Sequence, residues 1–290
     1  MKTRAFIYII LAGVLWGTSG LFVHFLTPLG FSSLQMTAMR GVVAFLCMFI
    51  LALLKNRDIF RVSKRELALF AASGLGIFGT ASSYYAAMQL TSVSTAVVLM
   101  YTAPIIVMVY SVLFMGEKMT AIKGVAVLAM LVGCCLVSGM IGGMKFHALG
   151  IFMGLLSGIS YSAYNIFTKV QMRGNSHPLS ATLYCFMFMA IFSLVSCQPF
   201  EASKIVMEHF WASVPLMIGI GIGTCVLPYF LYTLALKELP AGTASALGIV
   251  EPMSATVFSV LFLQEQLSVY SVCGIVLILV AVFLLSRNKE

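Results

Sequence analysis

The sequence predicts an all-α integral membrane protein with ten transmembrane helices in two inverted five-helix repeats. Three observations predict this fold class. The 290-residue chain is 61% hydrophobic and 9% charged, whereas a soluble domain is about 45–50% apolar and about 25% charged. The apolar residues form ten long runs with short breaks between them. One of these runs recurs later in the chain.

Each apolar run has about the 20 residues that a helix needs to cross the hydrocarbon core of a bilayer. The first run follows Lys2 and Arg4 as in a signal peptide, but it continues for the length of a span, which predicts a retained first helix. The long eighth run is expected to be tilted or broken. The predicted spans are 5–26, 33–54, 67–89, 93–115, 120–140, 147–168, 179–198, 209–236, 240–263 and 268–286.

The positive charges predict the orientation of these spans. With the N-terminus inside, fourteen of the 17 Lys and Arg residues fall in inside loops and tails. Lys145 and Lys204 fall outside, and Arg40 lies within the second span. Cytoplasmic loops carry the excess of basic residues, so we expect a multi-pass protein of the cytoplasmic (plasma) membrane with both termini in the cytoplasm.

The net charge of +8 does not indicate a nucleic-acid partner, because the basic residues form no stripe or basic helix face. The seven cysteines lie in apolar runs without metal-ligand spacing and are interpreted as small buried residues. The four histidines do not cluster. We therefore expect no metal and no cofactor.

An internal repeat aligns residues 91–117 with 239–265 at a constant offset of 148. Pro104 matches Pro252, and Glu117 matches Glu265, so distinctive residues agree at both ends of one span. The offset equates spans 3 and 4 with spans 8 and 9. Each unit then has five helices, and this odd number inverts the second copy, an architecture typical of secondary transporters. The predicted units are 1–142 and 143–290.

Three segments together resemble the drug/metabolite transporter superfamily, specifically its ten-helix EamA-type family. They are Trp16-Gly17, the span from Ala103-Pro104 to Gly116-Glu117, and its copy from Val250-Glu251-Pro252 to Gln264-Glu265. The resemblance covers essentially the whole chain and implies a plasma-membrane protein that moves metabolites, often outward. Gln264, in place of the glycine of the closing Gly-Glu pair, departs from the pattern.

Two charged residues fall inside predicted spans, where an unpaired charge costs about 2.5–3.5 kcal/mol on insertion scales. Glu251, beside Pro252, is a candidate counter-charge for the solute or a proton carrier; the alternative is a structural glutamate. Pro252 is expected to free a backbone carbonyl one turn earlier. Arg40 could bind a carboxylate, but a structural or snorkelling role is favoured.

Aromatic and amide side chains supply the rest of a predicted solute pocket, through ring faces and hydroxyls. The alternative for the tyrosines is a belt at the membrane interface. The candidates are Trp16, Tyr84, Tyr85, Tyr101, Tyr161, Asn165, Tyr229 and Tyr232.

Other residues are expected to act in packing, bending or gating. Small residues allow helices to approach closely, and carboxylates are favourable at helix N-termini. Glu117 and Glu265 are expected to cap the helix that follows each of them, with gating as the alternative. The candidate hinge and packing residues are Pro104, Pro252, Gly13, Gly17, Gly154 and Gly158.

The predicted function is a secondary carrier, most simply an exporter of amino acids or related metabolites, with proton coupling through Glu251 left open. Drug or organic-cation efflux and uptake remain alternatives within this class. No Walker motif (GxxxxGK[ST]) is present. The alternative of another class is an integral-membrane enzyme acting on lipid-linked substrates, which would need an acidic or histidine cluster at a membrane face; the loops lack such a cluster. A channel is a third class. The expected partners are a small-molecule solute and the lipid bilayer, and the oligomeric state is not predicted.

Overall fold

A computed structural model describes residues 2–55, 57–91, 96, 99–137, 147–263 and 268–287, and throughout these ranges the secondary structure is helical, without strands. Seven helical stretches are long and apolar enough to cross a membrane, and three shorter apolar helices accompany them. These ten stretches fall within or over the ten predicted spans. The all-α membrane fold predicted from composition is confirmed.

The helices of the N-terminal half begin with a first span that is interrupted at Thr18 and ends in a short 3-10 turn, η1 (Thr27–Leu29). A second 3-10 turn, η2 (Arg57–Phe60), joins the second and third spans. The helices are α1 (Lys2–Gly17), α2 (Ser19–Leu26), α3 (Ser33–Lys55), α4 (Lys64–Leu90), α6 (Ala103–Met115) and α7 (Ala121–Val137).

The C-terminal half contains a helix outside the predicted spans. Residues 199–208, expected to be a loop, form α10 because Pro199 starts the helix at its first position and Glu201 and Lys204 pair one turn apart on its surface. The helices are α8 (Ala148–Arg173), α9 (Pro178–Ser196), α10 (Pro199–Glu208), α11 (Phe210–Gly221), α12 (Leu227–Glu238), α13 (Ala241–Leu247), α14 (Val250–Leu263) and α15 (Val269–Arg287).

The eighth and ninth spans are both broken. A π-helical segment, η3 (Ile222–Val226), separates α11 from α12, in agreement with the expected break in the long eighth run. A turn at Gly248–Ile249 separates α13 from α14, just before Pro252. The fourth span has a matching turn at Tyr101–Thr102, just before Pro104. Proline cannot donate to the carbonyl four residues earlier, so each proline interrupts the regular hydrogen bonding of its span.

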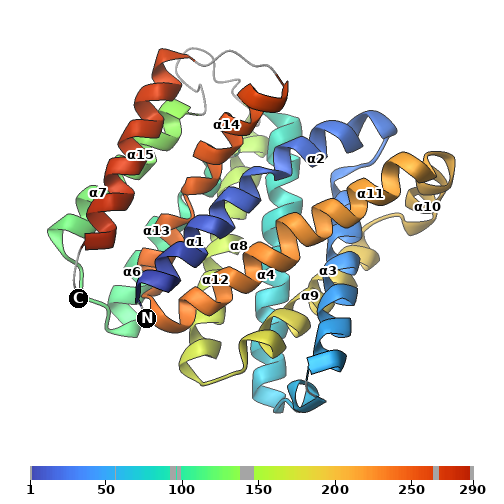
Figure 1. The fold of residues 1–290 in the computed structure, drawn as a ribbon, viewed down its shortest axis with the longest axis horizontal. Helices are drawn as coiled ribbons and strands as arrows, with labels where there is room; N and C mark the ends of the chain where they lie inside the picture. Colours follow the sequence, from blue (N-terminus) through green and yellow to red (C-terminus); the bar gives the residue numbers. More distant parts are fainter. Residues whose placement is uncertain are drawn as a thin grey trace.

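Helix pairing follows the repeat. Helix α3 packs along α9, α6 along α13, and α7 along α15. The pairing of α1 with α12 has its counterpart in that of α8 with α4. Figure 1 shows α7 and α15 side by side and antiparallel. If each of the first five spans is exchanged with its counterpart among the last five, these contacts between spans are reproduced.

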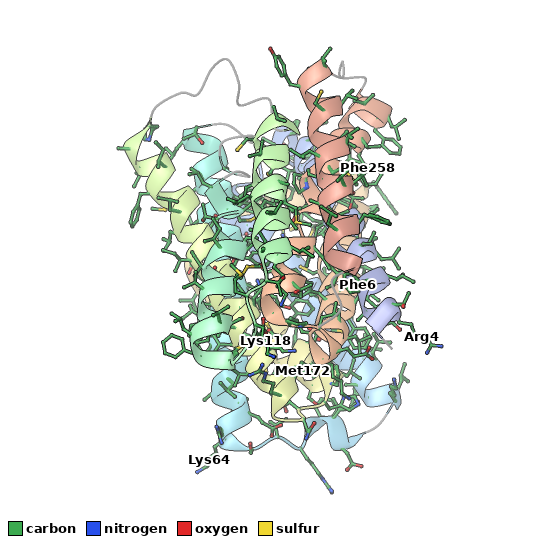
Figure 2. The ribbon with its side chains drawn as sticks, turned by 90° about the vertical axis from the view of Figure 1, so that its left-hand side faces the viewer. Arg4, Phe6, Lys64, Lys118, Met172 and Phe258 are labelled. Carbon is green, nitrogen blue, oxygen red and sulfur yellow. The ribbon has the colours of Figure 1, made fainter. Side chains whose placement is uncertain are left out.

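The beginning of α1 and the end of α15 lie at the same end of the bundle (Figure 1). Figure 2 shows Arg4, Lys64 and Lys118 at this end, and Phe258 toward the other. We call it the lysine-rich end. Large apolar side chains such as Leu54, Val195 and Leu113 are exposed on the outside of the bundle, where lipid is their natural solvent. Within lie one large core and a smaller cluster that includes Leu26 and Ile220.

Candidate functional site

Five aromatic side chains meet inside the bundle and form what we call the Trp/Tyr cluster: Trp16, Tyr161, Tyr164, Tyr229 and Tyr232. They come from α1, α8 and α12. The Trp16 ring lies 5.0 Å from Tyr229, 5.4 Å from Tyr232 and 6.4 Å from Tyr161, between ring centroids. All five side chains are buried. Tyrosines buried this deeply do not belong to an interfacial belt.

The polar groups of this cluster make two hydrogen bonds and include one buried donor without an acceptor among the described residues. The Tyr232 hydroxyl donates to Asn165 Oδ1, and Asn165 Nδ2 donates to the Tyr161 carbonyl at 2.7 Å. The Trp16 indole Nε1, in contrast, has no hydrogen-bond acceptor among the described residues, although the residue is only 5% exposed. A buried donor without a partner costs about 1–3 kcal/mol, so this group is suited to an acceptor atom brought by a ligand.

Glu251 lies on α14 beside the two proline breaks. Its Oε2 accepts a hydrogen bond of 2.7 Å from the Tyr101 hydroxyl, which also lies within 3.0 Å of the Gly248 carbonyl. Gly248 is the residue four before Pro252, so its carbonyl has no donor from that position and accepts instead from the Glu251 nitrogen at 3.0 Å. Tyr101 itself occupies the matching break of the fourth span. The two broken spans therefore meet at a carboxyl group inside the bundle, the arrangement typical of transporter binding sites.

Arg40 is buried on α3 and is bound by neutral groups. Its Nη1 donates to the Tyr85 hydroxyl at 3.1 Å, and its Nε donates to Cys225 Sγ at 3.1 Å. Cys225 lies in the π-helical segment of the eighth span, and such segments occur frequently at functional sites. The side chain therefore points into the bundle, and the alternative that it reaches for the interface does not fit its position.

The two charges face the same region without pairing. Glu251 interacts electrostatically with Arg40, yet the ion pairs formed by described residues do not include either group. Tyr84, partly buried beside Tyr85 at 5.9 Å between centroids, also interacts with Glu251. The site thus holds a carboxylate and a guanidinium on separate helices, with the aromatic rings of both halves around them.

The candidate packing glycines bring this site together. A Cβ added at Gly17 would lie 2.7 Å from Ser254 Cβ and 2.8 Å from the Ala255 nitrogen, and one at Gly13 would lie 3.0 Å from Val250 Cβ. Helix α1 therefore lies directly against α14 on both sides of Glu251.

Glycines allow an equally close helix contact in the second half. A Cβ at Gly158 would meet Thr102 Oγ1 at 2.6 Å, and one at Gly154 would meet Leu99 Cδ1 at 2.5 Å. Helix α8 thereby contacts the broken segment before Pro104, as α1 contacts the one around Pro252.

Glu117 caps a different helix from the one predicted. Its Oε1 accepts a hydrogen bond of 2.9 Å from the Ala241 nitrogen, at the start of α13 in the other half, instead of capping α7. Lys169 Nζ donates to the carbonyls of Leu236, at 2.8 Å, and of Leu239, at the end of α12. We call these contacts the 236–241 clamp. Glu265, the repeat counterpart of Glu117, lies outside the described residues.

Sequence reasoning missed three residues of this region. Tyr164 lies one helical turn after Tyr161, a spacing that could have identified it. Lys169 was placed in a loop because the sixth span was ended at 168, but α8 continues to Arg173. Cys225 had no signal in the sequence, because its proximity to Arg40 depends on tertiary packing. No three potential metal ligands of the described residues come together.

The fold and the site define a class: a multi-pass α-helical membrane protein with broken spans around an interior polar site. A family model described as the EamA-like transporter family matches the chain twice, over residues 3–139 and 148–287. The chain belongs to this family and is a membrane transporter.

Two similar proteins and a solved structure match nearly the whole chain, as the family model does. An uncharacterized transporter of Archaeoglobus fulgidus is 29% identical over 282 residues, which cover 97% of this chain and 95% of the relative. The uncharacterized transporter YwfM of Bacillus subtilis is 25% identical over 281 residues, covering 97% and 93%. A crystal structure with 17% sequence identity superimposes with a TM-score of 0.77 over 98% of this chain and 96% of that one, which shows the fold.

Proposed function

We propose that this protein is a secondary carrier that exports small zwitterionic metabolites, amino acids in particular, across the cytoplasmic membrane by alternating access. One observation carries the substrate class: Arg40 and Glu251 come from different helices, both interact electrostatically with Tyr229 of the Trp/Tyr cluster, and neither appears in the ion pairs of the described residues. A solute with an ammonium group and a carboxylate group would complement both charges.

The surroundings of each charge support the assignment of the solute's groups. An ammonium group beside Glu251 would also meet the faces of Tyr161 and Trp16, where cation–π attraction contributes about 0.5–2 kcal/mol. A carboxylate would accept from Arg40 and from the unpaired Trp16 Nε1. An organic cation, the runner-up substrate, would leave Arg40 without a negative partner and would be repelled by it.

Alternating access is supported by the two halves, 1–142 and 143–290, which we propose to be the moving units. The family model matches each half separately, and the helix contacts of one half have counterparts in the other. Glu251 has no counterpart in the first half, where Ala103 takes its place. This carboxyl group is our candidate for proton coupling. The lysine-rich end is proposed to face the cytoplasm.

A thermal-shift series on purified protein tests the substrate class, because a ligand that binds the folded state stabilises it. Each set compares an amino acid with its decarboxylated amine and with the carboxylic acid that lacks the amino group. We expect stabilisation by members of the amino acid series and by neither of the truncated partners. The positive compounds are then tested for efflux from proteoliposomes.

Two outcomes would contradict the proposal. Equal stabilisation by the amine and the amino acid would show that Arg40 does not bind the carboxylate of the solute, and would favour the organic-cation alternative. Binding without movement of any bound compound across the proteoliposome membrane would remove the carrier function itself.

A further inference from the structure

A small cavity lies directly beside the Trp/Tyr cluster. It has room for about one water molecule, with a volume of about 10 Å³. Four helices line it: α4, α8, α9 and α12. Its polar lining residues are Tyr164, Thr168, Gln171, Thr182, Cys185, Tyr229 and Thr233.

The hydroxyl of Thr168 is the unexplained group in this lining. Its Oγ1 has no hydrogen-bond partner among the described residues, and the residue is 3% exposed. Thr182 and Thr233 differ, because each donates to a carbonyl of its own helix at 2.8 Å. An unpaired hydroxyl beside a polar, water-sized space is the arrangement that a bound water satisfies.

The position of the cavity connects it with the candidate site. Tyr164 and Tyr229 belong both to its lining and to the Trp/Tyr cluster, so they separate the two. Thr168 and Gln171 follow Tyr164 along α8 toward Met172, which lies at the lysine-rich end (Figure 2). On that side, Gln171 Nε2 donates to the Leu69 carbonyl at 2.9 Å and to Ser73 Oγ at 2.5 Å, which joins α8 to α4.

We propose that this cavity is a hydrated subsite on the solute pathway, between the Trp/Tyr cluster and the lysine-rich end. In the conformation described here it holds water. When the pathway opens to the lysine-rich end, the hydroxyls of Thr168, Thr182 and Thr233 bind hydrogen-bonding groups of the solute. The inference rests on the proposed carrier function. Since α4 belongs to one half and the other three helices to the other, relative movement of the halves would enlarge the cavity.

The native thiol of Cys185 tests the position of the subsite. A variant that retains Cys185 alone is reconstituted and treated with a membrane-impermeant cationic methanethiosulfonate from each side in turn. We expect reaction from the lysine-rich side only, and its loss in Thr168→Phe, whose ring fills the cavity. A variant that retains Cys197 alone, near the other end of α9, is the matched control and is expected to react from the opposite side.

The Thr168 hydroxyl is tested by Thr168→Val, with Thr224→Val as the control. Thr224 is equally buried, but its hydroxyl donates to the Ile220 carbonyl at 2.6 Å and it does not line the cavity. Loss of a hydrogen bond to solute should lower apparent affinity about three- to tenfold in Thr168→Val. If the cavity is hydrated, Thr168→Val should also unfold at a lower temperature than the wild type.

The results separate this inference from the carrier proposal. An unreactive Cys185 beside a reactive Cys197 would overturn the subsite. So would a Thr168→Val variant that is more stable than the wild type, because removing an unpaired hydroxyl from a dry cavity is favourable. Wild-type protein that moves none of the tested solutes would instead overturn the carrier function, whatever the thiol reaction shows.

Discussion

At the scale of single residues, the site depends on what Pro252 does to its helix. The proline leaves the Gly248 carbonyl without its usual donor, and the Tyr101 hydroxyl lies close to both this carbonyl and Glu251. The Gly248 carbonyl accepts instead from the Glu251 nitrogen at 3.0 Å, and the break brings it to the Tyr101 hydroxyl of the other span. The carboxyl group is held in position by one neutral donor and leaves one oxygen for a solute or a proton.

Glu251→Gln tests the charge at this position. The amide keeps the size of the side chain and can still accept from Tyr101, but it cannot pair with an ammonium group or release a proton. We expect transport in proteoliposomes to fall about 10- to 100-fold, the change that corresponds to loss of one charge-assisted hydrogen bond. Thermal stability should change little.

The control for this substitution is Glu201→Gln on α10, whose carboxylate is half exposed and paired with Lys204. It should transport like the wild type. Wild-type flux through Glu251→Gln would remove Glu251 from the transport mechanism and leave it a structural residue.

At the scale of helices, glycines decide how closely the spans approach. Gly13 and Gly17 let α1 lie against α14, and Gly154 and Gly158 let α8 lie against the segment before α6. Both contacts are made next to a proline break. Close packing of small residues is a main source of helix association in lipid, where the hydrophobic effect does not distinguish helix from lipid.

Gly17→Ala should separate α1 from α14, because the new methyl group would lie 2.8 Å from the backbone nitrogen of Ala255, which cannot rotate away. Overpacking of this kind costs about 1–3 kcal/mol, so the thermal midpoint and the transport rate should both fall. The matched control is Gly20→Ala in α2, where no atom lies within 4 Å of the added Cβ. Equal stability of the two variants would show that the α1–α14 contact is not tight.

The 236–241 clamp is the second element-scale feature. Lys169 comes from α8 and Glu117 follows α6, and both bind backbone groups at the α12–α13 turn. An ammonium group at the end of α12 and a carboxylate at the start of α13 each complement a helix dipole. We propose that this clamp closes the lysine-rich end in the conformation described here.

Lys169→Met should weaken the clamp, because it leaves two carbonyls at the end of α12 without their donor. We expect a loss of about 1–3 kcal/mol of stability, measured as a lower midpoint of thermal unfolding. Lys204→Met is the control, since the Lys204 ammonium pairs with Glu201 in water at the surface and such pairs contribute about 0–1 kcal/mol. Similar midpoints for Lys169→Met and the wild type would show that the clamp does not hold the turn.

At the scale of the whole molecule, the contact pattern is that of two related units packed against each other. The α3–α9 and α7–α15 pairs join equivalent helices, α6 and α13 belong to equivalent spans, and the α1–α12 pair corresponds to the α8–α4 pair. This equivalence supports the proposal that the two units exchange conformations, because contacts at one end of the bundle have equivalents at the other. The π-helical segment and Glu251 occur in the second half, so the two halves differ at these two positions.

Single-cysteine labelling tests the orientation of the bundle. In a cysteine-free background, Arg4→Cys, Lys64→Cys and Lys118→Cys should react with an impermeant reagent from the cytoplasmic side. Lys204→Cys, on α10 after the far end of α9, should react from the outside. A different side for Arg4 and Lys118 would contradict both the span count and the inverted arrangement.

The fold class, the ten apolar stretches, the family and the breaks at Pro104 and Pro252 follow from the sequence, because hydrophobicity, charge placement and proline chemistry are local properties. Helix α10 and the extension of α8 were missed, since charged residues in short breaks look like loops. The meeting of Tyr101 with Gly248, of Arg40 with Cys225 and of Glu117 with Ala241 was decided only by the tertiary structure. Each joins residues more than 100 positions apart, and no local pattern specifies which surfaces of two packed helices face each other.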